Sequence, residues 1–460
     1  MVNRVAQEKI AVTIKDVIDN QLCTGCGVCI SEDSSATSQM IWNEDGFLIP
    51  RITEESSITS MLKVCPFNLK RQSLINEDML AKEVFKGIGH SDDDIGFYKE
   101  LYVGYSKQYR ESSSSGGIAT YIFEKLLTDG YVDNVFIVKE FQGRYAYQVF
   151  NDANKIREIS RTRYYPVTLE DLFKNINNIS GRIAVSGVSC FIKAIRLKQH
   201  HYPELRTKIP FLVGIICGGL KSRYYTDYLS QSAGCHDEYT NAEYRVKKKN
   251  SFALDYQFSC LSKKNKIIHV VDMQAMGDMW GTGLFKSNAC DFCDDVTTEL
   301  ADISLGDAWI EPYNLDGNGN NVVICRSELA KEIIANGIRK EELTLDLLPL
   351  SLMKLSQQGS FNHRHKGLSY RIKKANANNI QTPIKRHRFL KKQSFILNLI
   401  QERRLRTRHK SIEIWKKTKN SNDFDNGMYK YLKSLRRITT LNRRFNRVLS
   451  FLKRKIVGSK

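Results

Sequence analysis

Four cysteines near the start of the chain have the types and spacing of iron–sulfur ligands. Cys23, Cys26 and Cys29 are each separated by two residues, and Cys65 follows later, directly before a proline. Three close cysteines and a distant Cys-Pro form the ligand pattern of a four-iron four-sulfur (4Fe-4S) cluster in bacterial ferredoxins. Asp33 occupies the place where a two-cluster ferredoxin has its next cysteine, so this segment predicts one cluster. The alternatives are unligated thiols or a zinc knuckle, although zinc sites favour paired C-x-x-C units.

A second group of cysteines lies in the middle of the chain. It comprises Cys190, Cys217 and the C-x-x-C pair Cys290 and Cys293. Two of them follow predicted strands, and the ends of strands in a sheet commonly gather a site. On spacing alone, the C-x-x-C pair is compatible with zinc, a redox disulfide or a cluster.

A short serine- and glycine-rich motif could contact a bound cofactor. Ser114, Ser115, Gly116 and Gly117 stand directly before a predicted helix. The amino-terminal amides of a helix attract anionic groups such as a pyrophosphate, whereas a serine-rich run also occurs as a flexible linker. Asp307 ends a short predicted strand, which by itself is compatible with an ordinary turn. We assign no residue as catalytic.

The residues between these motifs indicate the elements that must position them. Gly25 and Gly27 allow the backbone to turn tightly between the first cysteines. Apolar residues at helical spacing predict a helix over Ile118–Thr128, and a second helix is predicted over Ile192–Lys198. Runs of β-branched and aromatic residues predict strands at Tyr131–Lys139, Tyr145–Phe150, Arg182–Val188 and Phe211–Cys217, and a hairpin over Met40–Ile52 that turns at Asp45-Gly46. Alternating strands and helices indicate a layered α/β domain.

The positive charge of the chain is concentrated at its C-terminal end. The formal net charge is +20, but residues 361–460 hold 29 Lys and Arg against 4 Asp and Glu. Apolar residues recur every three or four positions from Met428 to Ile456, which predicts a basic amphipathic helix. Such a helix binds an anionic membrane surface or packs on the protein itself, and we rank peripheral membrane contact first. Nucleic acid is electrostatically compatible, but no nucleic-acid motif accompanies the charge, so it ranks lower.

Length and apolar patterning limit the class of protein. A chain of 460 residues exceeds one ordinary core and predicts several modules. No apolar run reaches the roughly 20 residues of a bilayer-spanning helix, and the first residues lack a signal-peptide pattern. We therefore expect a cytoplasmic protein with reduced cysteines and an acidic connector whose run Ser91–Asp94 is solvated chain.

The body of the chain resembles the family of the coenzyme F420-reducing hydrogenase beta subunit. The motifs that carry the resemblance are Ser114–Gly117, Gly187–Cys190, Ile216–Gly219, Cys290–Cys293 and Ala301–Trp309. The resemblance implies FAD contacted by Ser114, Ser115, Gly116, Gly117 and Asp307. It also implies a second 4Fe-4S cluster on Cys190, Cys217, Cys290 and Cys293, and it covers the N-terminal ferredoxin module. Ser189 stands where the family usually has proline, so the geometry of the local turn is the one feature here that the resemblance does not predict.

These expectations combine into a fold of mixed α+β and α/β class. Residues 1–70 are predicted to form the ferredoxin-type module, and residues 71–100 a linker. A layered α/β region follows, with a flavin-binding part at 101–185 and a part holding the second cluster at 186–350. Residues 351–460 are expected to form a basic, largely helical tail.

The expected function is that of an iron–sulfur flavoprotein oxidoreductase. Electrons would pass from a donor such as ferredoxin, or from a dehydrogenase or hydrogenase subunit, through two 4Fe-4S clusters to FAD and an organic substrate. Family resemblance implies a sugar or lipid-linked sugar in surface polysaccharide biosynthesis. The alternatives are a non-catalytic electron-transfer subunit that reduces coenzyme F420 or another carrier, and a nucleic-acid-binding protein with structural clusters.

Overall fold

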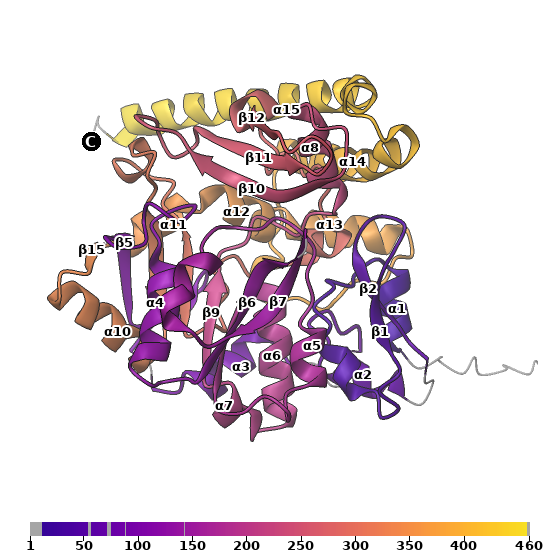
Figure 1. The fold of residues 1–460 in the computed structure, drawn as a ribbon. Coiled ribbons are helices and arrows are strands. Elements are labelled where there is room, and N and C mark those ends of the chain that lie inside the picture. The colour runs from indigo at the N-terminus through magenta and orange to yellow at the C-terminus, as the bar shows by residue number, and fades with distance from the viewer. Residues whose placement is uncertain (1–11, 54–56, 71–74, 88, 142, 458–460) are drawn as a thin grey trace, which may run out of the picture.

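A mixed eight-stranded sheet forms the centre of the molecule (Figure 1). The computed structural model describes residues 12–53, 57–70, 75–87, 89–141 and 143–457, and the side chains of 141, 144 and 446–457 are not described. The strand order is β15-β5-β14-β13-β9-β8-β6-β7, in which β6, β8, β9 and β13 are parallel and the other pairings are antiparallel. The strands are β5 (Glu100–Ser106), β6 (Asn134–Phe141), β7 (Arg144–Phe150), β8 (Ile183–Val188), β9 (Phe211–Ile215), β13 (Ile303–Asp307), β14 (Asn321–Cys325) and β15 (Leu343–Leu347).

The predicted α/β layering is confirmed, because helices cover both faces of this sheet. Helices α4 (Ile118–Thr128) and α10 (Glu328–Arg339) pack on one face, and α6 (Ser189–His201) packs on the other. Along β9, Val213 faces the α4 side and Leu212 faces the α6 side, as the two-residue period of a strand requires. All four predicted strands and both predicted helices are found, with ends shifted by a few residues.

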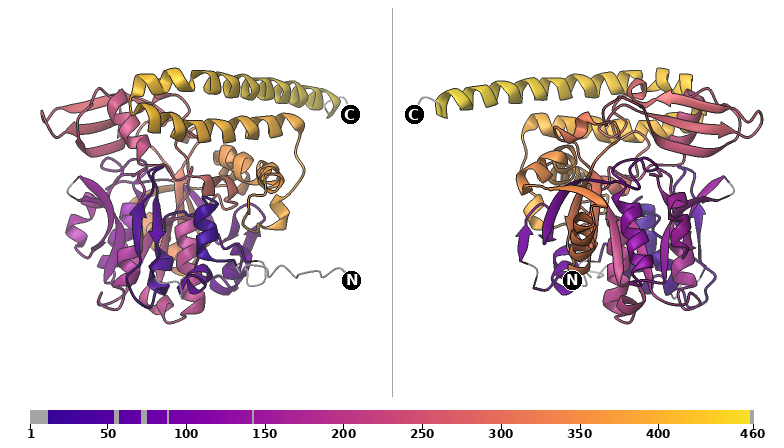
Figure 2. Two further views of the ribbon diagram at one scale, coloured as in Figure 1. Left: turned by 90° about the vertical axis from the view of Figure 1, so that its right-hand side faces the viewer. Right: turned by 60° about the vertical axis from the view of Figure 1, so that its left-hand side comes forward.

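A smaller antiparallel sheet and the C-terminal helices form a second layer above the central sheet (Figure 1). This layer contains β10 (Tyr239–Lys247), β11 (Tyr256–Ser262), β12 (Ile268–Asp272), α8 (Tyr224–Ser232), α14 (Phe395–Thr418) and α15 (Ser421–Val457). Trp415, Phe424 and Met428 are buried here against Tyr228 and Phe285. The basic C-terminal region is therefore packed on the body, while the far end of α15 projects past it (Figure 2).

The N-terminal module lies beside the central sheet (Figure 1). It contains α1 (Ile14–Asp19), η1 (Val28–Glu32), β1 (Gln39–Trp42), β2 (Leu48–Arg51) and α2 (Ser60–Lys63). The predicted hairpin is confirmed, with Gly46 in a left-handed conformation in its turn. The turn is fixed to the body, since Ser222 Oγ donates to the Asp45 carbonyl at 2.6 Å and Tyr224 Oη donates to the Glu44 carbonyl at 2.6 Å.

The acidic connector differs from the solvated chain that its sequence predicted. It forms α3 (Glu77–Val84) and a hairpin of β3 (His90–Asp92) and β4 (Gly96–Tyr98). Lys354 pairs with Asp92 at 3.1 Å and with Asp94 at 2.5 Å, and His365 contacts Asp94 at 3.1 Å. The carboxylates are held by cations from the C-terminal region, which composition alone could not reveal.

Short helices complete the fold and lead the chain between these layers. They are η4 (Ala153–Ile159), α5 (Glu170–Lys174), α7 (Leu205–Lys208), α9 (Met273–Met276), η5 (Asn288–Phe292), η6 (Tyr313–Leu315), α11 (Leu350–Ser356), α12 (Gln358–Phe361), η7 (Asn362–Lys366), α13 (Leu368–Ala377) and η8 (His387–Phe389). Among the described helices, none is long and apolar enough to span a bilayer.

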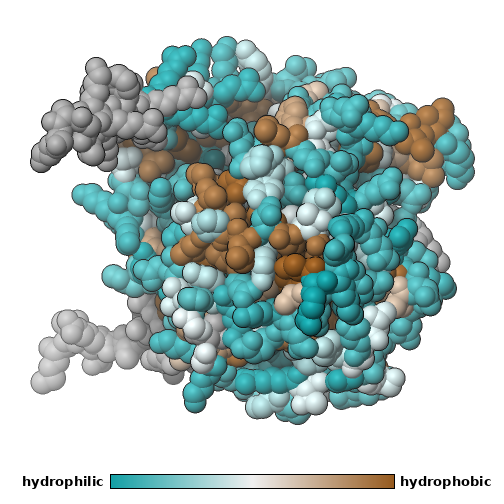
Figure 3. Space-filling view, turned by 90° about the vertical axis from the view of Figure 1, so that its left-hand side faces the viewer, coloured by the Kyte–Doolittle hydropathy of each residue, from teal (hydrophilic) through white to brown (hydrophobic). Residues whose placement is uncertain are grey.

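Apolar side chains gather on the side of the molecule where β15 and α11 lie (Figure 3). Exposed apolar residues on these two elements are Leu347, Leu352 and Leu355. Most of the surrounding surface in this view is hydrophilic, so the apolar exposure is local.

Candidate functional site

The first cysteine set lines one small cavity in the N-terminal module. Cys23, Cys26, Cys29 and Cys65 all border it, and the remaining wall is mostly apolar. The wall includes Val17, Leu22, Val64 and Phe67. The sequence therefore brings four thiols to one enclosed space, with no carboxylate among the lining residues.

Glycines shape the loop that carries these thiols. Gly25 and Gly27 both adopt left-handed conformations, with φ of 74° and 76°, which confirms the predicted tight turns. A side chain at Gly27 would collide with Thr168, so the loop approaches the body closely there. The amide of Gly25 donates to Cys23 Sγ at 3.4 Å, and such hydrogen bonds stabilise a ligand sulfur.

Asp33 has a structural role in the loop that follows. Its carboxylate accepts hydrogen bonds from the amides of Ser35 at 3.0 Å and Ser38 at 2.8 Å. Burial opposes its charge, but the hydrogen bonds from Ser38 and Ser35 outweigh burial and lower the pKa of Asp33. Asp33, which occupies the position of a further ferredoxin cysteine, thus stabilises a turn of the backbone.

The second cysteine set is assembled from three separate segments. Cys190 lies in the first turn of α6, Cys217 follows β9, and Cys290 and Cys293 belong to η5 and its end. Burial raises the pKa of Cys190 well above its ordinary value, and the charges of Cys290, Cys293 and Cys217 raise it further. The four thiols therefore lie close enough to interact electrostatically, although residues 190 and 293 are far apart in the sequence.

Backbone amides and a serine support this second set. The Gly219 amide donates to Cys217 Sγ at 3.2 Å, and the Leu220 amide donates to Cys290 Sγ at 3.1 Å. Ser189, the residue that departs from the family pattern, begins α6 and is buried. Its hydroxyl lies 3.1 Å from Thr298 Oγ1, so a side-chain hydrogen bond holds the turn where proline would restrict it.

Each donor set consists of four cysteine thiols. Within the described ranges, no three Cys, His, Asp or Glu side chains converge closely enough to hold a single metal ion. Burial raises the pKa of Cys29, and the neighbouring charges of Cys26, Cys23 and Cys65 add to the effect. Four thiols around one cavity, as in the first set, could hold a cubane, which spreads its thiolates around a cage of iron and sulfide.

The two sets are neighbours in space. The Cys26 charge reaches Cys190, and burial together with the charges of Cys190 and Cys26 raises the pKa of Tyr147. The Leu169 amide, which precedes α5, donates to the Cys26 carbonyl at 2.8 Å and ties the N-terminal module to the body of the molecule. An electron-transfer route between the sets would therefore be short.

A large cavity borders both sets. Its volume is about 560 Å³, within the range of roughly 300–1,000 Å³ for ligand pockets. Cys23 from the first set and Cys217 from the second line it. One thiol of each cysteine set therefore borders the same cavity.

Four of the five predicted cofactor-contact residues line the cavity: Ser114, Ser115, Gly117 and Asp307. Gly116 is absent from the lining, and a side chain on it would collide with the Gly104 carbonyl. The helix terminus is less free than the sequence indicated. The Ile118 amide donates to Asn321 Oδ1 at 3.3 Å, and the Ser114 hydroxyl accepts from the Thr162 amide at 2.9 Å.

Unpaired polar atoms supply a test of whether the cavity fits a polar ligand. Ser113 Oγ, Arg163 Nε and Arg245 Nε are buried without a hydrogen-bond partner among the described residues, and all three residues line the cavity. Buried polar groups are ordinarily paired, so these atoms favour a bound group with acceptor oxygens. Arg245 also forms an ion pair with Asp307, so the negative charge of this predicted cofactor contact is compensated within the protein.

Aromatic and cationic side chains that the sequence did not single out complete the cavity. Tyr164 and Trp280 meet edge to face with ring centroids 4.7 Å apart, and both line the cavity. Lys221 lies over the Trp280 ring at 4.6 Å, and burial with the nearby Lys286 lowers the pKa of Lys221 to about 7. No spacing pattern links these residues, so only the fold brings them together.

Comparison with known proteins identifies the family of the chain. Two family models match the chain, and both are described as "Coenzyme F420 hydrogenase/dehydrogenase, beta subunit". The model of the N-terminal part of that protein matches residues 101–174, and the model of its C-terminal part matches residues 180–349. Together they match more than half of the chain.

Individual relatives are more distant. The coenzyme F420-dependent sulfite reductase of Methanocaldococcus jannaschii is 23% identical over 352 residues, covering 72% of this chain and 49% of that protein. The chain thus spans about half the length of this curated relative. A chain of the F420-reducing NiFe hydrogenase complex from Methanosarcina barkeri matches with a TM-score of 0.49 and 18% identity, over 65% of this chain and 99% of that chain. From the two matched family models, the chain belongs to the coenzyme F420 hydrogenase/dehydrogenase beta subunit family, a family of oxidoreductases.

Proposed function

We propose that this chain is an iron–sulfur flavoprotein oxidoreductase, which takes electrons from a donor such as ferredoxin and delivers them to an organic substrate. The observation that carries the proposal is the cavity bordered by Cys23 of one thiol set and Cys217 of the other. When bound, two 4Fe-4S clusters supply one-electron transfer and FAD couples it to two-electron chemistry.

The residues of the chain have separate tasks in this proposal. Cys23, Cys26, Cys29 and Cys65 would hold one cluster, and Cys190, Cys217, Cys290 and Cys293 the other. Arg163 and Arg245 offer unpaired N–H donors to the phosphates of FAD. Tyr164 and Trp280 provide apolar walls that exclude water from the cavity.

Cofactor content after anaerobic purification tests the proposal directly. We expect about eight irons, matching acid-labile sulfide and about one FAD per chain. Arg245→Gln should lower flavin content and leave iron unchanged, while Arg339→Gln on the exposed surface of α10 should change neither. Flavin-free protein with four irons would overturn the proposal.

A second candidate function is a non-catalytic electron-transfer subunit that reduces coenzyme F420 or another carrier. The matched family models favour it, because their descriptions name a beta subunit. Reduction of F420 by the isolated chain with an artificial electron donor, together with stable co-purification of a partner, would support this role. The expected sugar or lipid-linked sugar substrate of surface polysaccharide assembly stays a prediction.

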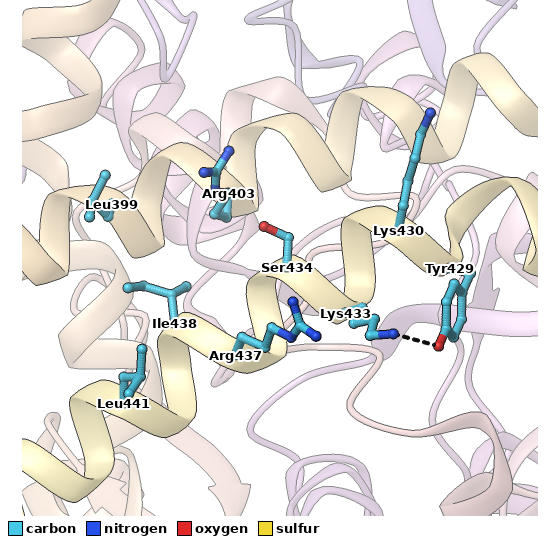
Figure 4. Close-up of a pocket in the computed structure, with 9 residues that line it drawn as sticks. All are labelled: Leu399, Arg403, Tyr429, Lys430, Lys433, Ser434, Arg437, Ile438 and Leu441. Carbon is cyan, nitrogen blue, oxygen red and sulfur yellow. Dashed lines mark hydrogen bonds between the residues drawn. The ribbon is translucent and has the colours of Figure 1, made fainter.

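Peripheral membrane contact is a further part of the proposal, and a groove between α14 and α15 supports it (Figure 4). The groove is lined by Leu399, Arg403, Tyr429, Lys430, Lys433, Ser434, Arg437, Ile438 and Leu441. Among the described residues, its four cations pair with no carboxylate, and Tyr429 and Leu441 are exposed beside them. Anionic lipid headgroups complement such a surface, since cations and apolar groups alternate along it.

Vesicle co-sedimentation tests this contact. We expect binding to phosphatidylglycerol vesicles, little binding to phosphatidylcholine vesicles, and release at high salt. Reversing Lys430, Lys433 and Arg437 to Glu should weaken binding about a hundredfold, given roughly 1 kcal/mol per basic residue. The matched triple reversal of Lys107, Lys264 and Lys340, which are exposed elsewhere, should bind normally. Preference for RNA over the anionic vesicles would contradict the lipid assignment.

A further inference from the structure

The C-terminal region covers the second cysteine set with buried cations. Arg364 in η7 is 3% exposed, and Arg371 in α13 is 2% exposed. Both lie beyond residue 349, where the matched family model ends. A segment outside the matched family region therefore forms part of the wall around this set.

Arg364 makes the most direct contact with the set. Its Nη2 donates to the Cys217 carbonyl at 2.6 Å, and its Nη1 donates to the Asp295 carbonyl. Burial lowers the pKa of Arg364, but the charges of Cys293, Cys217, Cys290 and then Asp295 outweigh burial and raise it. The buried guanidinium thus contacts the backbone of the Cys217 ligand segment and lies close enough to Cys293, Cys217 and Cys290 for its charge to act on them.

Two other cations near the set have carboxylate partners, whereas Arg371 donates to the Asp291 carbonyl at 2.5 Å. Lys286 pairs with Asp291 at 2.6 Å, and Lys385 pairs with Asp294 at 3.3 Å. Arg364 forms no ion pair with a carboxylate among the residues that the structure describes, and its hydrogen bonds go to backbone carbonyls. A buried guanidinium without an anionic partner is costly, so a negative group is needed next to it.

Among the residues that the structure describes, the first set has no buried cation that is free of a carboxylate partner. Lys193 is the cation whose charge reaches Cys65, and it pairs with Glu77 at 2.9 Å. The rest of the cavity wall is largely apolar. The two sets would therefore impose different electrostatic environments on the same kind of cluster.

We propose that Arg364 raises the reduction potential of a 4Fe-4S cluster held by the second set above that of the first. The inference rests on the proposed function, because it needs a cluster at each set. A cluster with four thiolates is anionic and gains one more negative charge on reduction, and net charge and hydrogen bonding set cluster potentials. The positive charge of the guanidinium stabilises the reduced state of the second cluster. Electron transfer from the first cluster to the second is therefore favourable.

Redox titration of the anaerobic holoprotein by electron paramagnetic resonance tests the proposal. Arg364→Gln keeps an N–H donor but removes the charge, and we expect the equilibrium for reducing the second cluster to fall about tenfold, which is about 59 mV for a one-electron couple. Arg364→Lys should retain most of the wild-type potential. Lys366→Gln, a matched change on the exposed side of η7, should shift neither cluster.

The outcomes separate this inference from the proposed function. Wild-type protein without a second cluster would defeat the proposed function itself. Two clusters in the wild type with an unchanged second potential in Arg364→Gln would overturn only the role of Arg364. If Arg364→Gln loses the second cluster, restoration of iron and potential by Arg364→Lys supports the charge, and failure of Arg364→Lys to restore them overturns it.

Discussion

Each of the two cysteine sets consists of four thiols, but their surroundings differ. The first is built within one small module, and its cavity wall is largely apolar. The second draws on α6, the end of β9 and η5, and buried ion pairs from the C-terminal region surround it. Local sequence can specify the first environment, whereas the second exists only when distant segments have folded together.

Removing one ligand from each set gives the largest expected effect and tests whether the sets are independent. We expect Cys26→Ser and Cys290→Ser each to lose about four irons and to retain the other cluster. Iron and sulfide analysis with electron paramagnetic resonance measures the remaining cluster. Cys260→Ser, a buried cysteine outside both sets, should keep all the iron. Loss of both clusters from either ligand variant would show that the two sets do not bind their clusters independently.

Breaking the buried ion pairs should destabilise the surroundings of the second set. Arg386 pairs with Asp294 at 3.1 Å and with Glu299 at 2.6 Å, and its side chain is 1% exposed. Arg386→Gln removes the closest cation from two buried carboxylates and leaves them only Lys385 and Arg388, so we expect a loss of about 3–5 kcal/mol in the free energy of unfolding. Urea denaturation under anaerobic conditions measures the loss. The control Arg388→Gln, at a partly exposed cation, should cost less, and equal costs would count against the ion-pair account.

Opening the apolar wall should affect the first set instead. Leu22 is fully buried and lines the first cavity. Leu22→Ala leaves a void there and should cost about 2–5 kcal/mol. Iron release from the first cluster on warming should accelerate, while the spectrum of the second cluster stays unchanged. Met79→Ala, at an exposed apolar residue, provides the control, and faster loss from the second cluster would contradict the prediction.

The smallest expected effect is a pH dependence of the free energy of unfolding caused by Lys221, which lies near Cys290 of the second set. Burial and the nearby Lys286 lower the pKa of Lys221 to about 7, whereas the unfolded chain titrates near its ordinary value of about 10.4. Between these values the unfolded state binds more protons, so stability should rise with pH by up to about 1.4 kcal/mol per unit. Lys221→Met should flatten this rise in urea titrations between pH 7.5 and 9, and an unchanged slope would exclude Lys221 as its source.

Sequence reasoning predicted the local features well. The tight turns at Gly25 and Gly27, the hairpin at Asp45-Gly46 and the α4 helix depend on neighbouring residues, so their patterns are visible in the chain. The second thiol set required a family resemblance, because Cys190 and Cys293 come together only through the sheet topology.

The C-terminal region shows where composition misleads. Its Lys and Arg content indicated a basic tail, yet Arg364, Arg371 and Arg386 are buried. Their partners, including Asp294 and the Cys217 carbonyl, lie far away in sequence, and neither charge nor periodicity identifies such pairings. The unpaired atoms of the large cavity were missed for the same reason.

The fixed turn of the N-terminal hairpin bears on how an outside donor reaches the protein. The carbonyls of Glu44 and Asp45 accept hydrogen bonds from the body, and Lys416 of α14 pairs with Asp45 at 2.9 Å. These contacts hold the N-terminal module against the body, which opposes a movement of the module away from it. In the proposed function, an electron donor would therefore bind to the outer surface of a fixed module, and the rate of electron delivery would depend on that binding step.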